Sequence, residues 1–260
     1  MDSWFGVNAI EMEKQREDSR VVSRIRVRNS STDDHYPFGR ADLNQHTDEA
    51  LRSWNQTCLT MRRYSVPMGS ITFISGAPAC GKSTLARSLA AQRTHGALLP
   101  TDDFYRFLSH PINPALAESR MQNQAVVRAF TASAATLAAD GYDVLVEGVI
   151  GPWWLEHIAA ICTEIAPTAA RRYVLLTARL DVVLARARAR GVRTQISATP
   201  EIVAAMHAQF DAIEGFASVS VDTNHDSPSQ LVAIVEQGLA DGRFDWATLP
   251  MRDGYPGQVN

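Results

Sequence analysis

One stretch of eight residues, Gly-Ala-Pro-Ala-Cys-Gly-Lys-Ser at positions 76–83, constrains the fold of this chain more than any other part of its sequence. It matches the pattern G-x-x-x-x-G-K-[ST] at every fixed position. In such a loop the glycines let the backbone curl until its N–H groups point at a phosphate, and the next helix adds its positive N-terminal end. Lys82 can then neutralise β- and γ-phosphate oxygens, while the Ser83 hydroxyl can bind Mg²⁺. The predicted nucleotide-binding residues are Gly76, Ala77, Pro78, Ala79, Cys80, Gly81, Lys82, Ser83 and Thr84.

Strand and helix signals alternate from Ser70 onward. The apolar runs that fit strands are 71–75, 97–99, 144–147, 173–176 and 218–221. The stretches that fit helices are 83–93, 115–140, 181–190, 199 to about 213, and 231–239. Continuous apolar strands that alternate with helices are typical of a parallel sheet covered on both faces. The predicted fold class is therefore α/β.

Several helix ends have local signatures. Thr199-Pro200 supplies an N-cap and a proline in the first turn, and Ser227 with Gln230 has the form of a capping box. Gly141 fits the position just after a helix, where a left-handed residue is favoured.

The two ends of the chain differ from its middle. Residues 1–67 carry charge clusters and a polar run with little apolar periodicity, so we expect a polar extension that is partly disordered. Within it, residues 21–28 fit either a short strand or an edge or disordered segment. The predicted domain covers 68–243, and the tail 244–260, rich in glycine and proline, is expected to be irregular.

Composition excludes several classes of protein. A net charge of −3 gives no general attraction to polyanions, so no nucleic-acid partner is expected. Three widely spaced cysteines do not form a disulfide framework, which favours the cytoplasm. No apolar run is long enough for a membrane span, and no membrane partner is expected. The sequence leaves the oligomeric state open.

Acidic residues follow the second and third predicted strands. Asp102 and Asp103 come directly after 97–99, and Glu147 ends the strand 144–147. Loops at the carboxyl ends of parallel strands share one crevice, so these acids should lie beside the phosphate loop. We predict that Asp102 is a base for an acceptor hydroxyl and Asp103 a helix cap, with the reverse as an alternative. Glu147 is predicted to act on Mg²⁺, the alternative being an ordinary acid at a strand end.

Four arginines lie in the eight residues 186–193. Helical spacing puts Arg186 and Arg190 on one face and turns Arg188 elsewhere. Planar cations suit a developing phosphoryl charge or stack on adenine, so we predict a nucleotide role for Arg186 and Arg190. A solvated arginine face, or a nucleic-acid patch, is the alternative. The sequence assigns no role to residues 221–224, which follow the last strand.

Taken together, these segments resemble the P-loop kinases of small molecules, a group that includes chloramphenicol phosphotransferase, gluconate kinase and the zeta-toxin kinases. The resemblance covers about 70–243 and rests on Gly76–Thr84, Asp102–Arg106, Glu147-Gly148 and the arginine segment, which looks like the short lid of these kinases. It implies a three-layer P-loop NTPase fold with a five-stranded parallel sheet of order 2-3-1-4-5 and a lid that closes. The family's acidic residue aligns with Asp102. No chloramphenicol or gluconate signature is present, so the acceptor is open.

The leading hypothesis is an ATP-dependent phosphotransferase that moves the γ-phosphoryl group of ATP to a hydroxyl of a small molecule, with ATP and Mg²⁺ as cofactors. Its catalytic residues would be Lys82, Asp102, Arg186 and Arg190, and its metal ligands Ser83 and Glu147. The alternatives are a toxin-like kinase of a nucleotide sugar and a nucleotide-dependent switch or regulatory ATPase.

Overall fold

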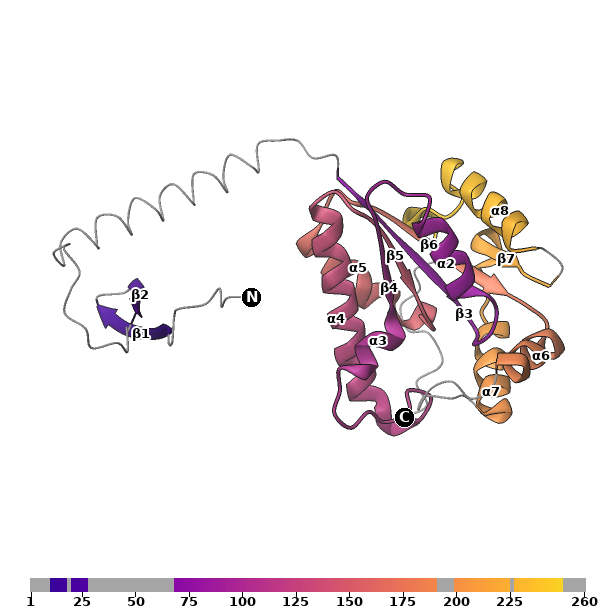
Figure 1. Cartoon of the computed structure of the whole chain (residues 1–260), viewed down its shortest axis with the longest axis horizontal. Coiled ribbons are helices and arrows are strands. Elements are labelled where there is room, and N and C mark those ends of the chain that lie inside the picture. The colour runs from indigo at the N-terminus through magenta and orange to yellow at the C-terminus, as the bar shows by residue number, and fades with distance from the viewer. Residues whose placement is uncertain (1–9, 18–19, 28–67, 191–198, 225–226, 250–260) are drawn as a thin grey trace, which may run out of the picture. The chain divides into compact units, whose positions relative to one another are not determined.

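The computed structural model describes residues 10–17, 20–27, 68–190, 199–224 and 227–249 (Figure 1). The chain divides into two compact units, Met1–Tyr64 and Ser65–Asn260.

The first unit contains an antiparallel pair of strands. β1 (Ile10–Glu17) pairs with β2 (Arg20–Val27), and the register joins Ile10 to Val27. Residues 21–27 therefore form a strand, which in a sheet of two strands is also an edge strand, and residue 28 lies outside the described residues. β1 was not predicted, because its alternation of apolar and charged residues is hidden in a cluster of charge. Residues 28–67, on which the expectation of partial disorder mostly falls, lie outside the described residues.

The second unit is built on a five-stranded parallel sheet. Its strands run in the order β4-β5-β3-β6-β7, which confirms the expected order 2-3-1-4-5 when they are counted within this unit. The strands are β3 (Ser70–Gly76), β4 (Gly96–Pro100), β5 (Asp143–Glu147), β6 (Ala170–Thr177) and β7 (Ser220–Asp222). All four pairings are parallel. The central strand β3 is buried from Ile71 to Gly76, as a parallel strand covered on both faces should be.

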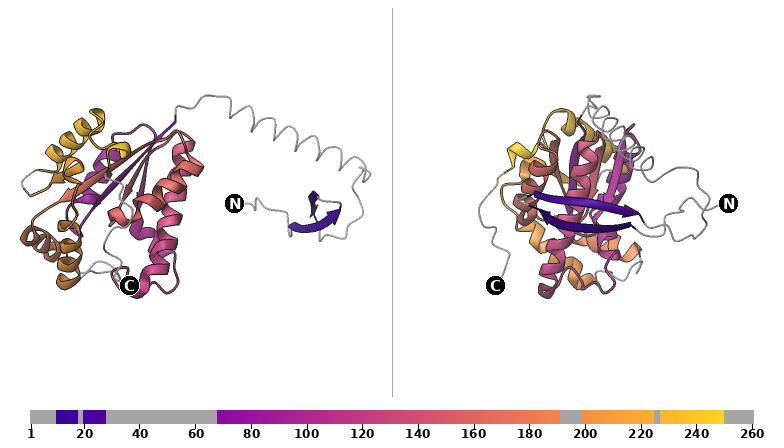
Figure 2. Two further views of the ribbon diagram at one scale, coloured as in Figure 1. Left: turned by 180° about the vertical axis from the view of Figure 1, so that it is seen from behind. Right: turned by 90° about the vertical axis from the view of Figure 1, so that its left-hand side faces the viewer.

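Helices cover the sheet in two outer layers (Figures 1 and 2), which confirms the three-layer P-loop NTPase fold. α4 packs against α5, and α2 packs against α8. The helices are α2 (Lys82–Ala90), α3 (Thr101–Arg106), α4 (Arg120–Ala139), α5 (Leu155–Ile165), α6 (Leu180–Arg190), α7 (Pro200–Asp211) and α8 (Pro228–Ala240). Single 3₁₀ turns occur at Ala117–Ser119, Pro152–Trp154, Ala217–Val219 and Trp246–Thr248. No helix in the described part of the chain has both the length and the apolar character that a membrane crossing requires.

The predicted helix ends are observed. Thr199 caps α7 by accepting a hydrogen bond from the Ile202 N–H, and Ser227 and Gln230 form a complete capping box on α8. Gly141, just after α4, has a φ of 88°, in the left-handed region that glycine adopts at low cost. These local signals were readable because each acts within a few residues of its own helix.

The hydrophobic core continues past residue 243, where the sequence analysis ended the domain. Phe244 is fully buried, and Trp246 and Leu249 are 8% and 7% exposed. The Trp246 ring lies 5.5 Å from that of Phe73 on the central strand, and the Phe244 carbonyl accepts a 2.9 Å hydrogen bond from the Tyr173 N–H. The first residues of the predicted tail are thus part of the core.

Ending the chain after Arg243 should abolish cooperative unfolding, whereas ending it after Leu249 should not. Burial of three large apolar side chains stabilises a fold by roughly 5–9 kcal/mol. That is most of the stability of an ordinary domain. Urea unfolding followed by circular dichroism compares the two truncations. Equal transitions in both would show that residues 244–249 are dispensable.

Candidate active site

The candidate site lies at the carboxyl ends of the parallel strands (Figure 1). The phosphate loop follows β3, α3 follows β4, and Glu147 ends β5. Thr223 follows β7. The sheet therefore gathers, at one edge, residues that lie up to about 150 positions apart in the chain.

The loop has backbone angles that only certain residues tolerate. Gly76 has a φ of 140°, and a Cβ there would lie 2.3 Å from the Leu176 carbonyl oxygen, so the close approach to β6 requires glycine. Gly81 has a φ of 106°. Ala79 is left-handed at φ 64° although it has a side chain, a conformation that costs an L-residue roughly 1–2 kcal/mol. Its methyl group packs with Val183 of α6 and Val203 of α7 in a small hydrophobic cluster.

Lys82 is folded back onto its own loop. Its ammonium donates hydrogen bonds to the carbonyl oxygens of Gly76 at 3.0 Å and Ala77 at 2.8 Å. The residue is only 8% exposed. A buried cation is tolerated only with hydrogen-bond partners, so these two carbonyls hold the charge at the loop.

Glu147 is buried behind the same loop, with 9% of its surface exposed. Burial raises the pKa of its carboxyl above the ordinary value of 4.5, although the Lys82 charge and a hydrogen bond with Ser83 lower it. The negative charge of Asp102 raises this pKa further. Ser83, Lys82 and Asp102 therefore each lie close enough to Glu147 to act on its carboxyl.

The oxygen atoms of Ser83 and Glu147 suit Mg²⁺, which prefers oxygen ligands and is commonly held by one or two carboxylates together with phosphate oxygens and water. Among the described residues, no group of three or more His, Cys, Asp or Glu side chains could hold a metal ion by itself. The donors present thus fit a metal that is bound jointly by protein and nucleotide.

Asp102 and Asp103 both lie in the first turn of α3. The expectation that Asp103 caps this helix is wrong, because Pro100 occupies the N-cap position and no side chain caps it. β4 runs into α3 without a spacer, which leaves no capping position for an acid. Asp103 instead accepts a hydrogen bond from Arg106. Asp102 is exposed. Burial raises the pKa of Tyr105, and the negative charge of Asp102 raises it further.

Arg186 points at the residue that follows β7. Its guanidinium donates to the Thr223 hydroxyl oxygen at 3.1 Å and to the Thr223 carbonyl oxygen at 2.6 Å. Arg188 is exposed, as expected. Arg190 ends α6, but its side chain lies outside the described residues, as does the part of the arginine segment, the expected lid, from residue 191 onward. Sequence reasoning singled out residues 221–224 by their place after the last strand but assigned no role to Thr223.

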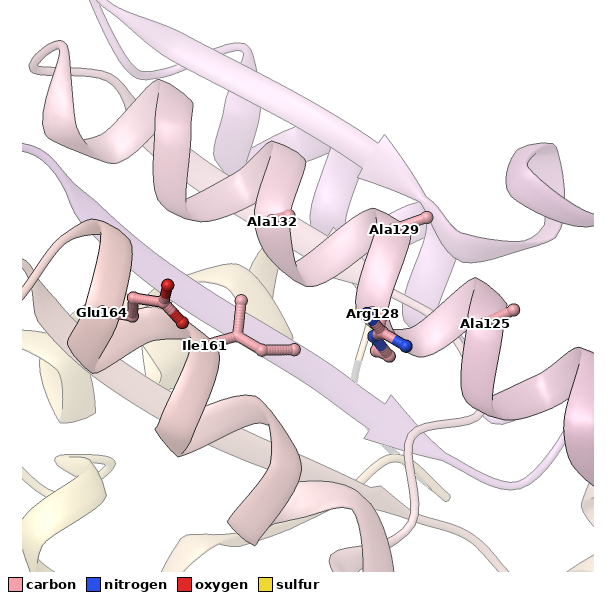
Figure 3. A pocket seen from close by; sticks show the side chains of 6 residues that line it. All are labelled: Ala125, Arg128, Ala129, Ala132, Ile161 and Glu164. Atoms are coloured by element: carbon pink, nitrogen blue, oxygen red, sulfur yellow. The ribbon is translucent and has the colours of Figure 1, made fainter. Parts of the chain in front are cut away.

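A groove of about 430 Å³ lies elsewhere, between α4 and α5 (Figure 3). Its lining residues are Ala125, Arg128, Ala129, Ala132, Ile161 and Glu164. None of them belongs to the predicted site, and most are alanine or isoleucine. The groove is therefore not the candidate active site.

A family model, AAA_33, described as an AAA domain, matches residues 71–213, which is more than half of the chain. No curated protein matches the chain.

Several solved structures are similar to it. A gluconokinase from Sinorhizobium meliloti 1021 has 16% identity over 67% of this chain and 93% of its own, with a TM-score of 0.48. A tunicamycin resistance protein from Deinococcus radiodurans has 16% identity over 66% of this chain and 95% of its own, with a TM-score of 0.47. A shikimate kinase from Bacteroides thetaiotaomicron has 17% identity over 66% of this chain and 98% of its own, with a TM-score of 0.47. At these values none of them assigns an activity to this chain.

Replacing Glu147 with glutamine should change how stability depends on pH. Because the folded state raises the pKa of Glu147, native wild-type protein holds its proton more tightly than the unfolded chain does. Wild-type stability should therefore fall, relative to Glu147→Gln, as pH rises from the ordinary value of 4.5 through the raised pKa. Urea unfolding of both proteins over a pH series measures this difference. Wild-type stability that stays constant or rises relative to Glu147→Gln over this pH range would contradict the assignment.

Proposed function

The chain belongs to the AAA_33 family of AAA domains, and from this premise we propose that it is an ATP-dependent phosphotransferase that acts on a hydroxyl group of a small molecule. The family and the P-loop kinase-like fold account for nucleotide binding. The step from nucleotide binding to transfer rests on the residues around the loop.

The observation that carries the proposal is the position of Asp102. An exposed carboxylate stands close enough to the buried Glu147 for its charge to raise the pKa of that group. Glu147 in turn interacts with Ser83 and Lys82 of the phosphate loop. Glu147 is thus a buried acid next to Ser83, and Asp102 is a second acid that is open to solvent. A transferase can use both, one acid to bind a metal ion and the open one to accept the proton of an acceptor hydroxyl.

In the proposed reaction, the loop N–H groups and Lys82 hold the phosphates of ATP. The Lys82 ammonium has to exchange at least part of its bonding to the Gly76 and Ala77 carbonyls for phosphate oxygens. Ser83 and Glu147 would hold Mg²⁺, which supplies charge neutralisation to the phosphates when bound. Arg186, and by the same proposal Arg190, would stabilise negative charge on the nucleotide.

Asp102 would accept the proton of the acceptor hydroxyl as its oxygen attacks the γ-phosphorus atom. A new bond joins that oxygen to phosphorus, the bond to the β,γ-bridging oxygen breaks, and ADP leaves with the bonding electrons. Asp102 then loses its proton to water, which its exposure permits.

We propose a small acceptor rather than nucleic acid because the chain carries a net charge of −3. Cys80 and Cys162 are free, buried thiols, which suits a reducing compartment such as the cytoplasm, where ATP is available.

The direct test is a screen of hydroxylated compounds with ATP and Mg²⁺, read by mass spectrometry as the gain of one phosphate. Lys82→Ala should lower the rate for any acceptor by roughly 10²-fold or more, because it removes the charge that is proposed to bind the phosphate oxygens. Its folding is checked by circular dichroism, since two hydrogen bonds within the loop are lost as well. Nucleotide hydrolysis without any phosphorylated product across the screen would favour the switch or regulatory ATPase.

A second prediction concerns the acceptor base. Asp102→Asn keeps the size of the side chain but cannot take a proton, so transfer should fall by roughly 10²–10⁴-fold. ATP affinity, measured by titration calorimetry, should stay close to that of wild type.

Asp103→Asn is the matched control, because it changes the neighbouring acid in the same helical turn, where the carboxylate only pairs with Arg106. It should leave the rate largely intact. Slow transfer in Asp103→Asn with normal transfer in Asp102→Asn would show that Asp103, and not Asp102, is the base. Normal transfer in both variants would show that neither acid of α3 is the base.

A further inference from the structure

Thr223 is a buried residue at the edge of the candidate site to which the proposed reaction assigns no role. It follows β7 directly and is 3% exposed. Its N–H donates to the Thr177 carbonyl oxygen at 2.9 Å, which fixes its backbone to the end of β6. The position of its side chain is therefore set by the sheet.

The Thr223 hydroxyl joins three segments of the site. Its oxygen lies 3.0 Å from the carbonyl oxygen of Cys80 in the phosphate loop and 3.1 Å from that of Thr177. The single hydroxyl hydrogen can be donated to only one of these carbonyls at a time. The same oxygen accepts a hydrogen bond from Arg186 of α6 at 3.1 Å.

Arg186 is held by two bonds to this one residue, because its second nitrogen donates to the Thr223 carbonyl oxygen at 2.6 Å. Two parallel bonds fix the plane of a guanidinium group as well as its position. A positive donor also polarises the hydroxyl and strengthens the bond that it donates onward. The charge of Arg186 is thus connected to the loop carbonyl of Cys80 through a single hydroxyl group.

An apolar contact joins the same two segments next to this bond. Ala79, the residue before Cys80, packs its methyl group on Val183 of α6. Adjacent loop positions therefore contact α6, one through a methyl group and the other through Thr223 and Arg186.

We infer that Thr223 is a positioning residue that holds Arg186 and the Cys80 end of the phosphate loop in a fixed relation, so that both meet the same nucleotide. The inference rests on the proposed function for the identity of that ligand. The link itself is a property of the chain without nucleotide and can be tested there.

The first experiment measures hydrogen exchange of the full chain without nucleotide. Thr223→Val keeps the shape of the side chain and removes the hydroxyl, while Thr223→Ser keeps the hydroxyl. Thr223→Val should speed exchange at the loop amides of residues 77 and 79–82 and in the first turns of α6 by about tenfold, the effect of losing one hydrogen bond to a charged group. Thr223→Ser should stay within about twofold of wild type.

Two outcomes would overturn the inference. Unchanged exchange in α6 of Thr223→Val would show that no link exists. Faster exchange that includes α4 to the same degree would show that Thr223 only stabilises the whole fold.

The second experiment is a double-mutant cycle on ATP affinity with Thr223→Val, Arg186→Ala and both together. If Thr223 acts through Arg186, Thr223→Val should weaken ATP binding about tenfold in the wild-type protein. In a protein that already carries Arg186→Ala, the same substitution should weaken ATP binding less than about threefold. Equal effects in the two backgrounds would overturn action through Arg186.

A further variant covers the case in which Thr223→Val does not fold. Arg186→Lys keeps the charge but not the planar pair of donors, so it should lose nearly as much ATP affinity as Arg186→Ala. Affinity equal to wild type would refute the positioning role. Absence of ATP binding by the wild-type chain would instead refute the proposed function, and the exchange experiment would still decide the role of Thr223.

Discussion

The parallel pairing of β3 with β5 on one side and β6 on the other is the constraint on which the candidate site depends. The register sets Ile74 opposite Glu147 and Gly76 opposite Leu176. The phosphate loop therefore begins between a strand that ends in a buried acid and a strand that leads to α6. A shift of this register by one residue would turn the Glu147 side chain to the other face of the sheet.

Lys82 and Glu147 are both buried at the candidate site, and burial of ionisable groups lowers the stability of the folded protein. The Glu147 carboxyl loses solvation, and the attraction of Lys82 does not fully offset that loss, because the pKa of the carboxyl remains raised. The Lys82 side chain donates hydrogen bonds to two carbonyl oxygens of its own loop. The ionised form of Glu147 therefore destabilises the folded protein, and a bound cation would stabilise it. We interpret this as stability given up for ligand binding.

The phosphate loop and α6 are joined by side chains that a sequence motif does not specify. Ala79 occupies a variable position of the loop pattern, yet it is left-handed and packs on α6. Thr223 lies outside the motif altogether and contacts both the loop and Arg186. These contacts join the loop after β3, the helix α6 and the residue after β7. The arrangement of the phosphate loop therefore depends on several elements at the carboxyl ends of the strands.

The sequence by itself determined the features that arise within a few residues of each other: the loop at 76–83, the alternation of strands and helices, and the capping box at Ser227. It placed Asp102 and Glu147 at strand ends. It also predicted that Asp103 caps α3, which is wrong because β4 leads directly into α3 and Pro100 occupies the N-cap position. Only the tertiary structure decided that Phe244 belongs to the core and that Thr223 meets Arg186. The reason is physical: caps and glycine turns are settled by local backbone sterics and hydrogen bonds, whereas contacts between distant segments depend on strand order and register, which no single segment encodes.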